Sequence, residues 1–308
     1  MLDIISVGPG EAVLLTDDAK QAIDRADAVW CAARHAVLVP PEKARPLSPL
    51  EGAIEQMRLS SDVGQSAAVL VSGDAGLYSL LEMLKRKIGG EYLRVHPGVS
   101  ALQLFAARLG VSWQDAKILS AHGRALSESA LCHAVRTHRQ TFCFLDAAHN
   151  PAWVRESLNL GGLENVRLFV GERLSYPDER TEAYDPDATY DPLCMAYIEN
   201  DAPESGLPPV GLSDEAFIRG KTPMTKRDVR ALVVSALHLK PNGVVWDIGA
   251  GTGSVSVECA RQCPLGEVYA VEMKDEALDL IRRNAERFHA LNLRVVPGRA
   301  LEVMSALP

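Results

Sequence analysis

Three glycines alternate with other residues directly after a strand that ends with an acidic side chain. Residues 244–248 are hydrophobic apart from Asp247 and predict a buried strand, which the glycine-spaced loop follows before a helix begins. The glycines are Gly249, Gly251 and Gly253. A residue without Cβ lets the backbone approach a ligand where a side chain would clash. Residues 268–272 predict a second short strand, whose last residue, Glu272, is placed to bind ribose hydroxyls. This order predicts a site for a nucleoside-like cofactor.

Two cofactors use such a loop, and the spacing distinguishes them. The dinucleotide fingerprint G-x-G-x-x-G requires a third glycine at position 255, where this chain has Val255. The observed spacing, D-x-G-x-G-x-G, resembles instead the first motif of the class I S-adenosylmethionine-dependent methyltransferases. The loop therefore predicts S-adenosylmethionine as the cofactor.

The first 110 residues contain three further loops that follow predicted strands. They are Gly8-Pro9-Gly10, Ser72-Gly73-Asp74-Ala75-Gly76 and His96-Pro97-Gly98-Val99-Ser100-Ala101. In open parallel sheets, ligands bind outside the carboxyl ends of the strands. A single loop of this kind is most often only a turn, but three in succession predict a second cofactor cleft.

Strand and helix alternate along residues 1 to about 200, which predicts largely parallel sheets covered on both faces. We expect strands at 4–7, 28–31, 67–71, 92–95, 117–120, 141–145, 166–170 and 193–198, and helices at 16–26, 77–88 and 100–110. The break at 110–115 predicts two lobes. Residues 201–209 are polar and proline-rich and predict a linker. A helix at 226–238 and a strand at 293–296 belong to the domain after it.

Composition restricts the function classes. The net charge of -8 gives no broad basic surface, which disfavours a nucleic-acid substrate. The six cysteines include no C-x-x-C pair, so we expect reduced core or surface thiols. No hydrophobic run reaches the length of a membrane span, and no leader precedes the first strand. We expect a cytoplasmic enzyme without a membrane contact or a metal site.

The strand-end loops resemble those of the tetrapyrrole methylase family. The matching motifs are Ile-Ser-Val-Gly-Pro-Gly at 5–10, Val-Ser-Gly-Asp-Ala-Gly-Leu-Tyr-Ser at 71–79, His-Pro-Gly-Val-Ser-Ala at 96–101 and Leu-Ser-Ala-His-Gly-Arg at 119–124. Pro-Met-Thr-Lys at 223–226 and Asp-Ile-Gly-Ala-Gly-Thr-Gly-Ser-Val-Ser at 247–256 resemble corrin-ring methyltransferases that act at carbon 15 with decarboxylation. The resemblance implies an α/β chain: a two-lobed tetrapyrrole methylase domain (1–205), then a partial class I Rossmann-like methyltransferase domain (206–308).

The resemblance also implies which residues contact the cofactor. In the first domain they are Pro9, Gly73, Asp74, Leu77, Ser100 and Ala101, and in the second they are Thr225, Gly249, Ala250, Gly251, Thr252, Gly253, Glu272 and Ala300. The chain departs from the family at Ser6, where glycine is usual, and at Ala75, where proline is usual. Arg299 stands where class I methyltransferases often carry an aspartate that faces the adenine.

Methyl transfer needs alignment of a carbon nucleophile and exclusion of water more than covalent help. A corrin precursor, the implied substrate, carries many carboxylates, which arginine and histidine side chains can bind. Candidates are Arg34 and His35, after the second predicted strand, and His122 and Arg124, in a turn that could equally be solvated. Asp74, His122 and Arg124 are the candidate catalytic residues, although Asp74 could instead cap a helix.

The second domain reaches only the third of the seven strands of a class I sheet before Pro308. The strand-end loops of the first domain most resemble those of the corrin-ring methyltransferases that act at carbon 5, so we expect this domain to methylate that carbon. Because the second domain is partial, we expect no reaction at carbon 15 from this chain as given. We also expect a homo-oligomer. Two alternatives remain: an RNA or protein methyltransferase, and a non-catalytic S-adenosylmethionine-binding or docking module.

Overall fold

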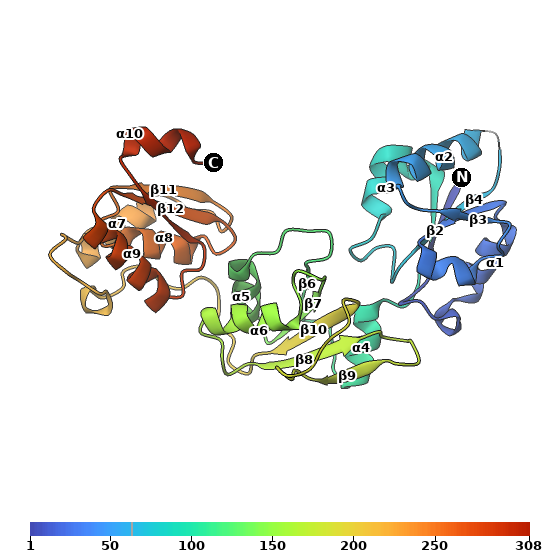
Figure 1. The fold of residues 1–308 in the computed structure, drawn as a ribbon, viewed down its shortest axis with the longest axis horizontal. Helices are drawn as coiled ribbons and strands as arrows, with labels where there is room; N and C mark the ends of the chain where they lie inside the picture. The colour runs from blue at the N-terminus through green and yellow to red at the C-terminus, as the bar shows by residue number, and fades with distance from the viewer. Residues whose placement is uncertain (63) are drawn as a thin grey trace. The chain divides into compact units, whose positions relative to one another are not determined.

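The computed structural model describes residues 1–62 and 64–308. The chain divides into two compact units, residues 1–115 with 169–195 and residues 116–168 with 196–308. Three sheets contain all the strands that these described residues form (Figure 1). Each sheet is described by itself.

The first sheet is built from parallel strands in the order β3-β2-β4-β1-β5. Its strands are β1 (Leu2–Ser6), β2 (Ala28–Cys31), β3 (Ala44–Pro46), β4 (Ala67–Val71) and β5 (Leu93–His96), and the helices around it are α1 (Asp17–Arg25), α2 (Leu50–Asp62), α3 (Leu81–Ile88) and α4 (Ala101–Leu109). Because all pairings are parallel, the loops after β1, β2, β4 and β5 lie at one edge of the sheet.

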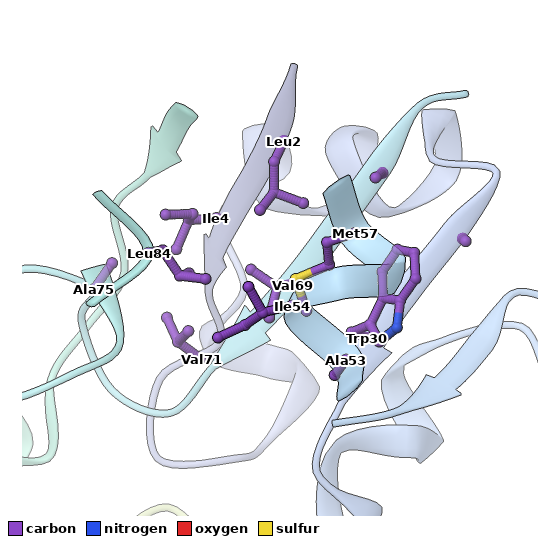
Figure 2. Packing of buried hydrophobic residues seen from close by; sticks show 12 residues of the cluster. Leu2, Ile4, Trp30, Ala53, Ile54, Met57, Val69, Val71, Ala75 and Leu84 are labelled. Atoms are coloured by element: carbon purple, nitrogen blue, oxygen red, sulfur yellow. The ribbon is translucent and has the colours of Figure 1, made fainter. Parts of the chain in front are cut away.

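Helices cover both faces of this sheet, which explains why its strands β2 and β4 are apolar along their whole length. On one face, Ile54 and Met57 of α2 and Leu84 of α3 pack against alternate residues of β1, β2 and β4 (Figure 2). On the other face, Ala22 and Ile23 of α1 pack against the intervening residues. All five residues of β1 are buried. A strand buried on both faces holds the loop that follows it firmly in place.

The second sheet has the order β6-β7-β10-β8-β9. Its strands are β6 (Lys117–Ser120), β7 (Gln140–Phe144), β8 (Arg167–Glu172), β9 (Arg180–Ala183) and β10 (Cys194–Glu199), and its helices are α5 (Glu128–Thr137) and α6 (Pro151–Leu160). β6 and β7 are parallel, whereas β8 and β9 are antiparallel.

The third sheet consists of parallel strands in the order β11-β12-β13. Its strands are β11 (Val244–Ile248), β12 (Glu267–Glu272) and β13 (Leu293–Pro297), and its helices are α7 (Arg227–Ala236), α8 (Ser254–Gln262), α9 (Asp275–Arg287) and α10 (Ala300–Val303). β12 lies in the middle, and β11 has one neighbour in the described chain. The loop after β11 and the end of β12 therefore lie side by side.

Most of the predicted elements are confirmed, with ends shifted by one or two residues. The strand at 244–248 is confirmed as β11, but the prediction that it is buried was wrong, because its residues alternate between exposed and half-buried in the described structure. Thr16 caps α1, and Ser100 caps α4, which ends at Gly110 in the left-handed conformation as predicted. The separation into lobes at 110–115 is confirmed by the two separate five-stranded sheets. The helix predicted from Leu77 was wrong at its start, because α3 begins at Leu81. The prediction also missed β3, α2, α5, α6 and β9.

The structure also shows where the cysteines lie and how long the apolar helices are. All six cysteines are buried and unpaired, so none is a surface thiol. Among the helices of the described residues, none is long and apolar enough to cross a membrane.

Candidate functional site

The loops after β1 and β4 are joined by backbone hydrogen bonds. The Gly8 amide donates to the Gly73 carbonyl at 3.1 Å, and the Gly73 amide donates to the Gly8 carbonyl at 2.7 Å. Both glycines have positive φ, +70° and +67°. An added Cβ at Gly73 would meet only the Ser100 Cα, at 3.9 Å, so the space above this glycine is open. Such an open backbone surface at a strand end can accept a ligand.

Asp74 connects the loop after β4 to the loop after β5. Its Oδ1 accepts the Gly76 amide at 2.8 Å, and its Oδ2 accepts the Gly98 amide at 3.2 Å. Asp74 does not cap α3, so the helix-cap alternative was wrong. Its side chain instead closes a turn within its own loop by accepting the Gly76 amide.

Ser6 and Ala75, the two departures from the family pattern, contact each other. The Ala75 amide donates to the Ser6 hydroxyl at 2.9 Å, and both residues are buried. A proline at 75 would have no amide hydrogen, and a glycine at 6 would have no hydroxyl. The two departures together form a hydrogen bond that the usual pair of residues cannot form.

The remaining predicted cofactor contacts of the first domain lie at the same edge of the sheet. Ser100 caps α4 through a capping box with Gln103, which fixes Ala101 as the first helical residue. Pro9 is buried between Gly8 and Gly10, and Leu77 lies half-buried after the Asp74 turn. The structure therefore brings together the loops that contain Pro9, Gly73, Asp74, Leu77, Ser100 and Ala101.

Arg34 and His35, after β2, form a cluster with Ser72, after β4. The Arg34 Nη2 donates to the Ser72 Oγ at 2.6 Å, and its Nε donates to the His35 Nε2 at 3.2 Å. The Ser72 Oγ also lies 2.8 Å from His35 Nε2. Burial, and to a smaller extent the neighbouring Arg34 charge, together lower the pKa of His35 to about 4. The imidazole is therefore neutral at physiological pH and accepts through Nε2.

His122 and Arg124 lie in an exposed turn after β6. The Arg124 amide donates to the Ala121 carbonyl, which closes this turn. Asp74 and this turn belong to different compact units, so a shared catalytic role for Asp74, His122 and Arg124 stays a prediction. In the described residues, no three or more histidine, cysteine or acidic side chains are grouped so that they could bind a metal ion.

The loop after β11 needs glycines at all three predicted positions. Gly249, Gly251 and Gly253 have φ values of +82°, +57° and +74°. At Gly253 an added Cβ would lie 3.1 Å from the Ile281 side chain, whereas at Gly249 it would meet nothing within 4 Å. Gly253 therefore allows α8 to pack against α9, and Gly249 leaves an open backbone surface where a ligand could approach. Ala250 and Thr252 lie between these glycines.

Glu272, at the end of β12, holds this glycine loop through its carboxylate. Its Oε2 accepts the Gly251 amide at 3.0 Å, and its Oε1 accepts the Met273 and Lys274 amides at 2.8 and 3.0 Å. Burial raises the pKa of this carboxyl, but the three backbone amides outweigh burial and the pKa lies below its usual value. A carboxylate has about four lone-pair positions, so about one remains for a ribose hydroxyl.

Asp247 accepts a hydrogen bond from the Ser256 hydroxyl at 2.5 Å, which connects β11 to the first turn of α8. Burial raises the pKa of Asp247, the hydrogen bond from Ser256 opposes this, and the Glu272 charge raises it again. Two carboxylates thus lie beside the glycine loop. An anionic ligand would be disfavoured there, which fits a cofactor portion without phosphate.

The sequence analysis missed a buried arginine that supports the loop at Thr225. Arg230 of α7 is fully buried, and its Nε donates to Glu258 of α8 at 2.7 Å. Its Nη1 donates to the Thr225 carbonyl at 2.7 Å and to Asp214 at 3.2 Å. The guanidinium also lies 4.6 Å from the ring centre of Phe217. No local pattern indicates these partners, because they come from three separate segments: Asp214 with Phe217, Thr225, and Glu258.

Thr225 and Ala300 lie next to helix starts in the second domain. Thr225 precedes α7, and Ala300 is the first residue of α10, after Arg299. The Thr252 hydroxyl is buried and has no hydrogen-bond partner in the described part of the chain. The predicted cofactor contacts of the second domain thus lie at or just after the ends of β11, β12 and β13 and in the segment before α7.

Parallel strands with glycine loops at their carboxyl ends are typical of proteins that bind nucleoside-containing cofactors. Comparison with known proteins identifies the family. Residues 1–185 match the family described as Tetrapyrrole (Corrin/Porphyrin) Methylases, and residues 215–308 match the Precorrin methyltransferase domain. The first match covers more than half of the chain, so the chain belongs to the tetrapyrrole methylase family. The resemblance of the loop motifs is thereby confirmed.

The whole chain is 32% identical, over 321 aligned residues, to Precorrin-6Y C(5,15)-methyltransferase [decarboxylating] of Sinorhizobium sp, of which it covers 76%. Its second part is 48% identical over 101 residues, 32% of this chain, to Probable cobalt-precorrin-6B C(15)-methyltransferase (decarboxylating) of Pyrobaculum calidifontis. The match covers 52% of that protein, so the chain spans about half the length of this relative.

The first part also shares its fold with a solved structure, Uroporphyrin-III C-methyl transferase from Thermus thermophilus complexed with S-adenyl homocysteine. The two have a TM-score of 0.53 and 18% sequence identity over 64% of this chain and 96% of that chain. At this identity the comparison shows a common fold.

Proposed function

We propose that this chain is an S-adenosylmethionine-dependent methyltransferase of cobalamin biosynthesis. Residues 1–205 methylate a precorrin ring at carbon 5. Residues 206–308 belong to a domain that methylates carbon 15 and removes the ring C acetate as carbon dioxide. The observation that carries this proposal is full-length similarity to a relative whose name gives both activities, together with a glycine loop in each half.

Each half offers a backbone surface that suits the cofactor. In the first domain, Gly73 is open above its Cα, and Asp74 holds its loop against Gly98. In the second, Gly249 is open, and Glu272 fixes the position of Gly251. When bound, S-adenosylmethionine supplies a methyl group on a sulfonium. The residues of the chain bind, orient and shield the reacting groups, because this electrophile needs little covalent assistance.

The same assignment leads us to propose the substrate, the cellular compartment and the oligomeric state. The substrate is a precorrin tetrapyrrole, and the enzyme works in the cytoplasm as a homo-oligomer, without nucleic acid, membrane or metal. The acidic balance of the chain supports the exclusion of nucleic acid.

Titration with S-adenosylhomocysteine and mass spectrometry of the product test the proposal. We expect the first domain to bind S-adenosylhomocysteine, and incubation with S-adenosylmethionine and precorrin-6Y to add a methyl group. Gly73→Ala should weaken binding, because its Cβ enters the open surface. Gly110→Ala is the matched control, since Gly110 has the same φ of +67° and open surroundings. Equal binding by these two variants, or an unchanged mass of the tetrapyrrole, would contradict the assignment.

A further inference from the structure

Arg34 is held as a pre-oriented cation at the edge of the first sheet. Its Nε and Nη2 are bound by His35 and Ser72, which uses two of its five N–H groups. No acidic side chain of the described residues pairs with this guanidinium, although its side chain is exposed. An arginine fixed on one side by neutral partners keeps its remaining N–H groups available for a planar anion such as a carboxylate.

His35 determines this arrangement through its tautomer. Nε2 accepts from Arg34, so the ring proton resides on Nδ1, which is buried without a partner in the described structure. The imidazole is buried, with 1% of its surface exposed. A protonated imidazole could not accept from Arg34 and would repel it. His35 is therefore a positioning residue that acts on Arg34.

A cavity of about 580 Å³ lies beside the same segment. Arg34 belongs to the short 3-10 helix Ala33–Leu38, and two residues of this helix, Ala33 and Ala36, line the cavity. The wall is mostly apolar and includes Cys31, Pro46 and Leu80, with Arg45 and Ser48 as its polar members. A mostly apolar cavity that shares a helix with a fixed guanidinium suits a ligand that has an apolar ring edge and a peripheral carboxylate.

We propose that Arg34 binds a peripheral carboxylate of the tetrapyrrole while the adjoining ring edge occupies this cavity. The inference rests on the proposed function and names a substrate contact of the same enzyme. Ser72 precedes Gly73 and Asp74 directly, so a carboxylate held at Arg34 places its ring beside the cofactor loop of β4. The subsite thus orients the substrate relative to the cofactor.

Binding of cobyrinic acid, a corrinoid with free peripheral carboxylates, tests the subsite in the full chain. We expect Arg34→Gln to weaken binding about 10- to 100-fold, the range for a lost charge-assisted contact. The fully esterified corrinoid should bind wild type and variant alike, because it has no carboxylate. Arg25→Gln is the control, since Arg25 is exposed and lies before β2, at the opposite edge of the sheet. Equal binding of cobyrinic acid by both variants would overturn the proposal.

Two His35 variants separate positioning from general damage to the fold. His35→Phe removes the acceptor and should weaken cobyrinic acid binding several-fold, whereas His35→Gln keeps an acceptor near Nε2 and should restore it. S-adenosylhomocysteine affinity, measured on the same samples, should stay unchanged in every variant. Wild type that binds S-adenosylhomocysteine but not cobyrinic acid would refute the subsite alone, and wild type that binds neither would refute the proposed function as well.

Discussion

Replacement of Glu272 by glutamine tests whether this carboxylate holds the glycine loop. The glutamate accepts three backbone amides, and the glutamine amide nitrogen cannot accept any. The least costly orientation keeps the oxygen toward Met273 and Lys274 and turns the nitrogen toward the Gly251 amide. One charge-assisted hydrogen bond is then lost, and the other two become neutral.

The magnitude follows from these three bonds. A hydrogen bond to a charged group contributes about 1.5 to 3 kcal/mol and a neutral one about 0.5 to 1.5 kcal/mol. Loss of one charge-assisted bond costs about 1.5 to 3 kcal/mol, and weakening of each of the other two costs about 1 to 1.5 kcal/mol. The free energy of unfolding of the second domain should therefore fall by about 3.5 to 6 kcal/mol. The Gly251 amide should also exchange its hydrogen faster, since its acceptor is gone.

Urea unfolding and hydrogen exchange of the peptide that contains Gly251 measure both effects. Glu267→Gln is the control, because Glu267 lies on the same strand, and its side chain, 40% exposed, binds Tyr269 and Arg294 rather than the loop. A free energy of unfolding within about 0.5 kcal/mol of wild type, with unchanged exchange at Gly251, would refute the loop-holding role. A loss of S-adenosylhomocysteine affinity in Glu272→Gln without faster exchange at Gly251 would support an additional contact of Glu272 with the ribose.

Three further changes have defined outcomes. Gly253→Ala should lower the thermal stability more than Gly249→Ala, because both adopt positive φ but only Gly253 faces a packed side chain; equal losses would contradict this. Arg230→Leu should destabilise the second domain by about 3 to 5 kcal/mol in urea unfolding, since it leaves the Glu258 carboxylate buried without its cation, and a change below 1 kcal/mol would contradict the network. His35 takes up its proton at about pH 4 when folded and at about 6.5 when unfolded. The free energy of unfolding should therefore fall by at most about 3 kcal/mol as the pH drops from 6.5 to 4, and a His35→Gln variant with the same pH dependence would exclude His35 as the source.

The sequence predicted best what local patterns determine. The sequence pattern predicted the first and last residues of β2, β4 and β6 correctly. The capping residues Thr16 and Ser100 predicted the starts of α1 and α4. Glycine spacing identified a loop whose glycines all have positive φ. These features depend on backbone geometry within a few residues, so a single sequence contains them.

Contacts between distant segments could not be predicted in this way. Arg230 gives no local sign that it is the largest fully buried side chain, because its partners lie up to 28 residues away. Arg34 and His35 were recognised as candidates, but Ser72, 38 residues from Arg34, was not. The start of α3 was misplaced because Tyr78 has a positive φ of +50°, which a right-handed helix cannot contain.

The contact of Ser6 with Ala75 makes the effects of substitution at the two positions dependent on each other. Exchange of Ala75 for proline alone leaves the buried Ser6 hydroxyl without its donor, and exchange of Ser6 for glycine alone leaves the Ala75 amide without its acceptor. Each single step back toward the usual family residues is therefore unfavourable, whereas both together restore a compatible pair. The two substitutions should therefore be non-additive in their effect on the free energy of unfolding.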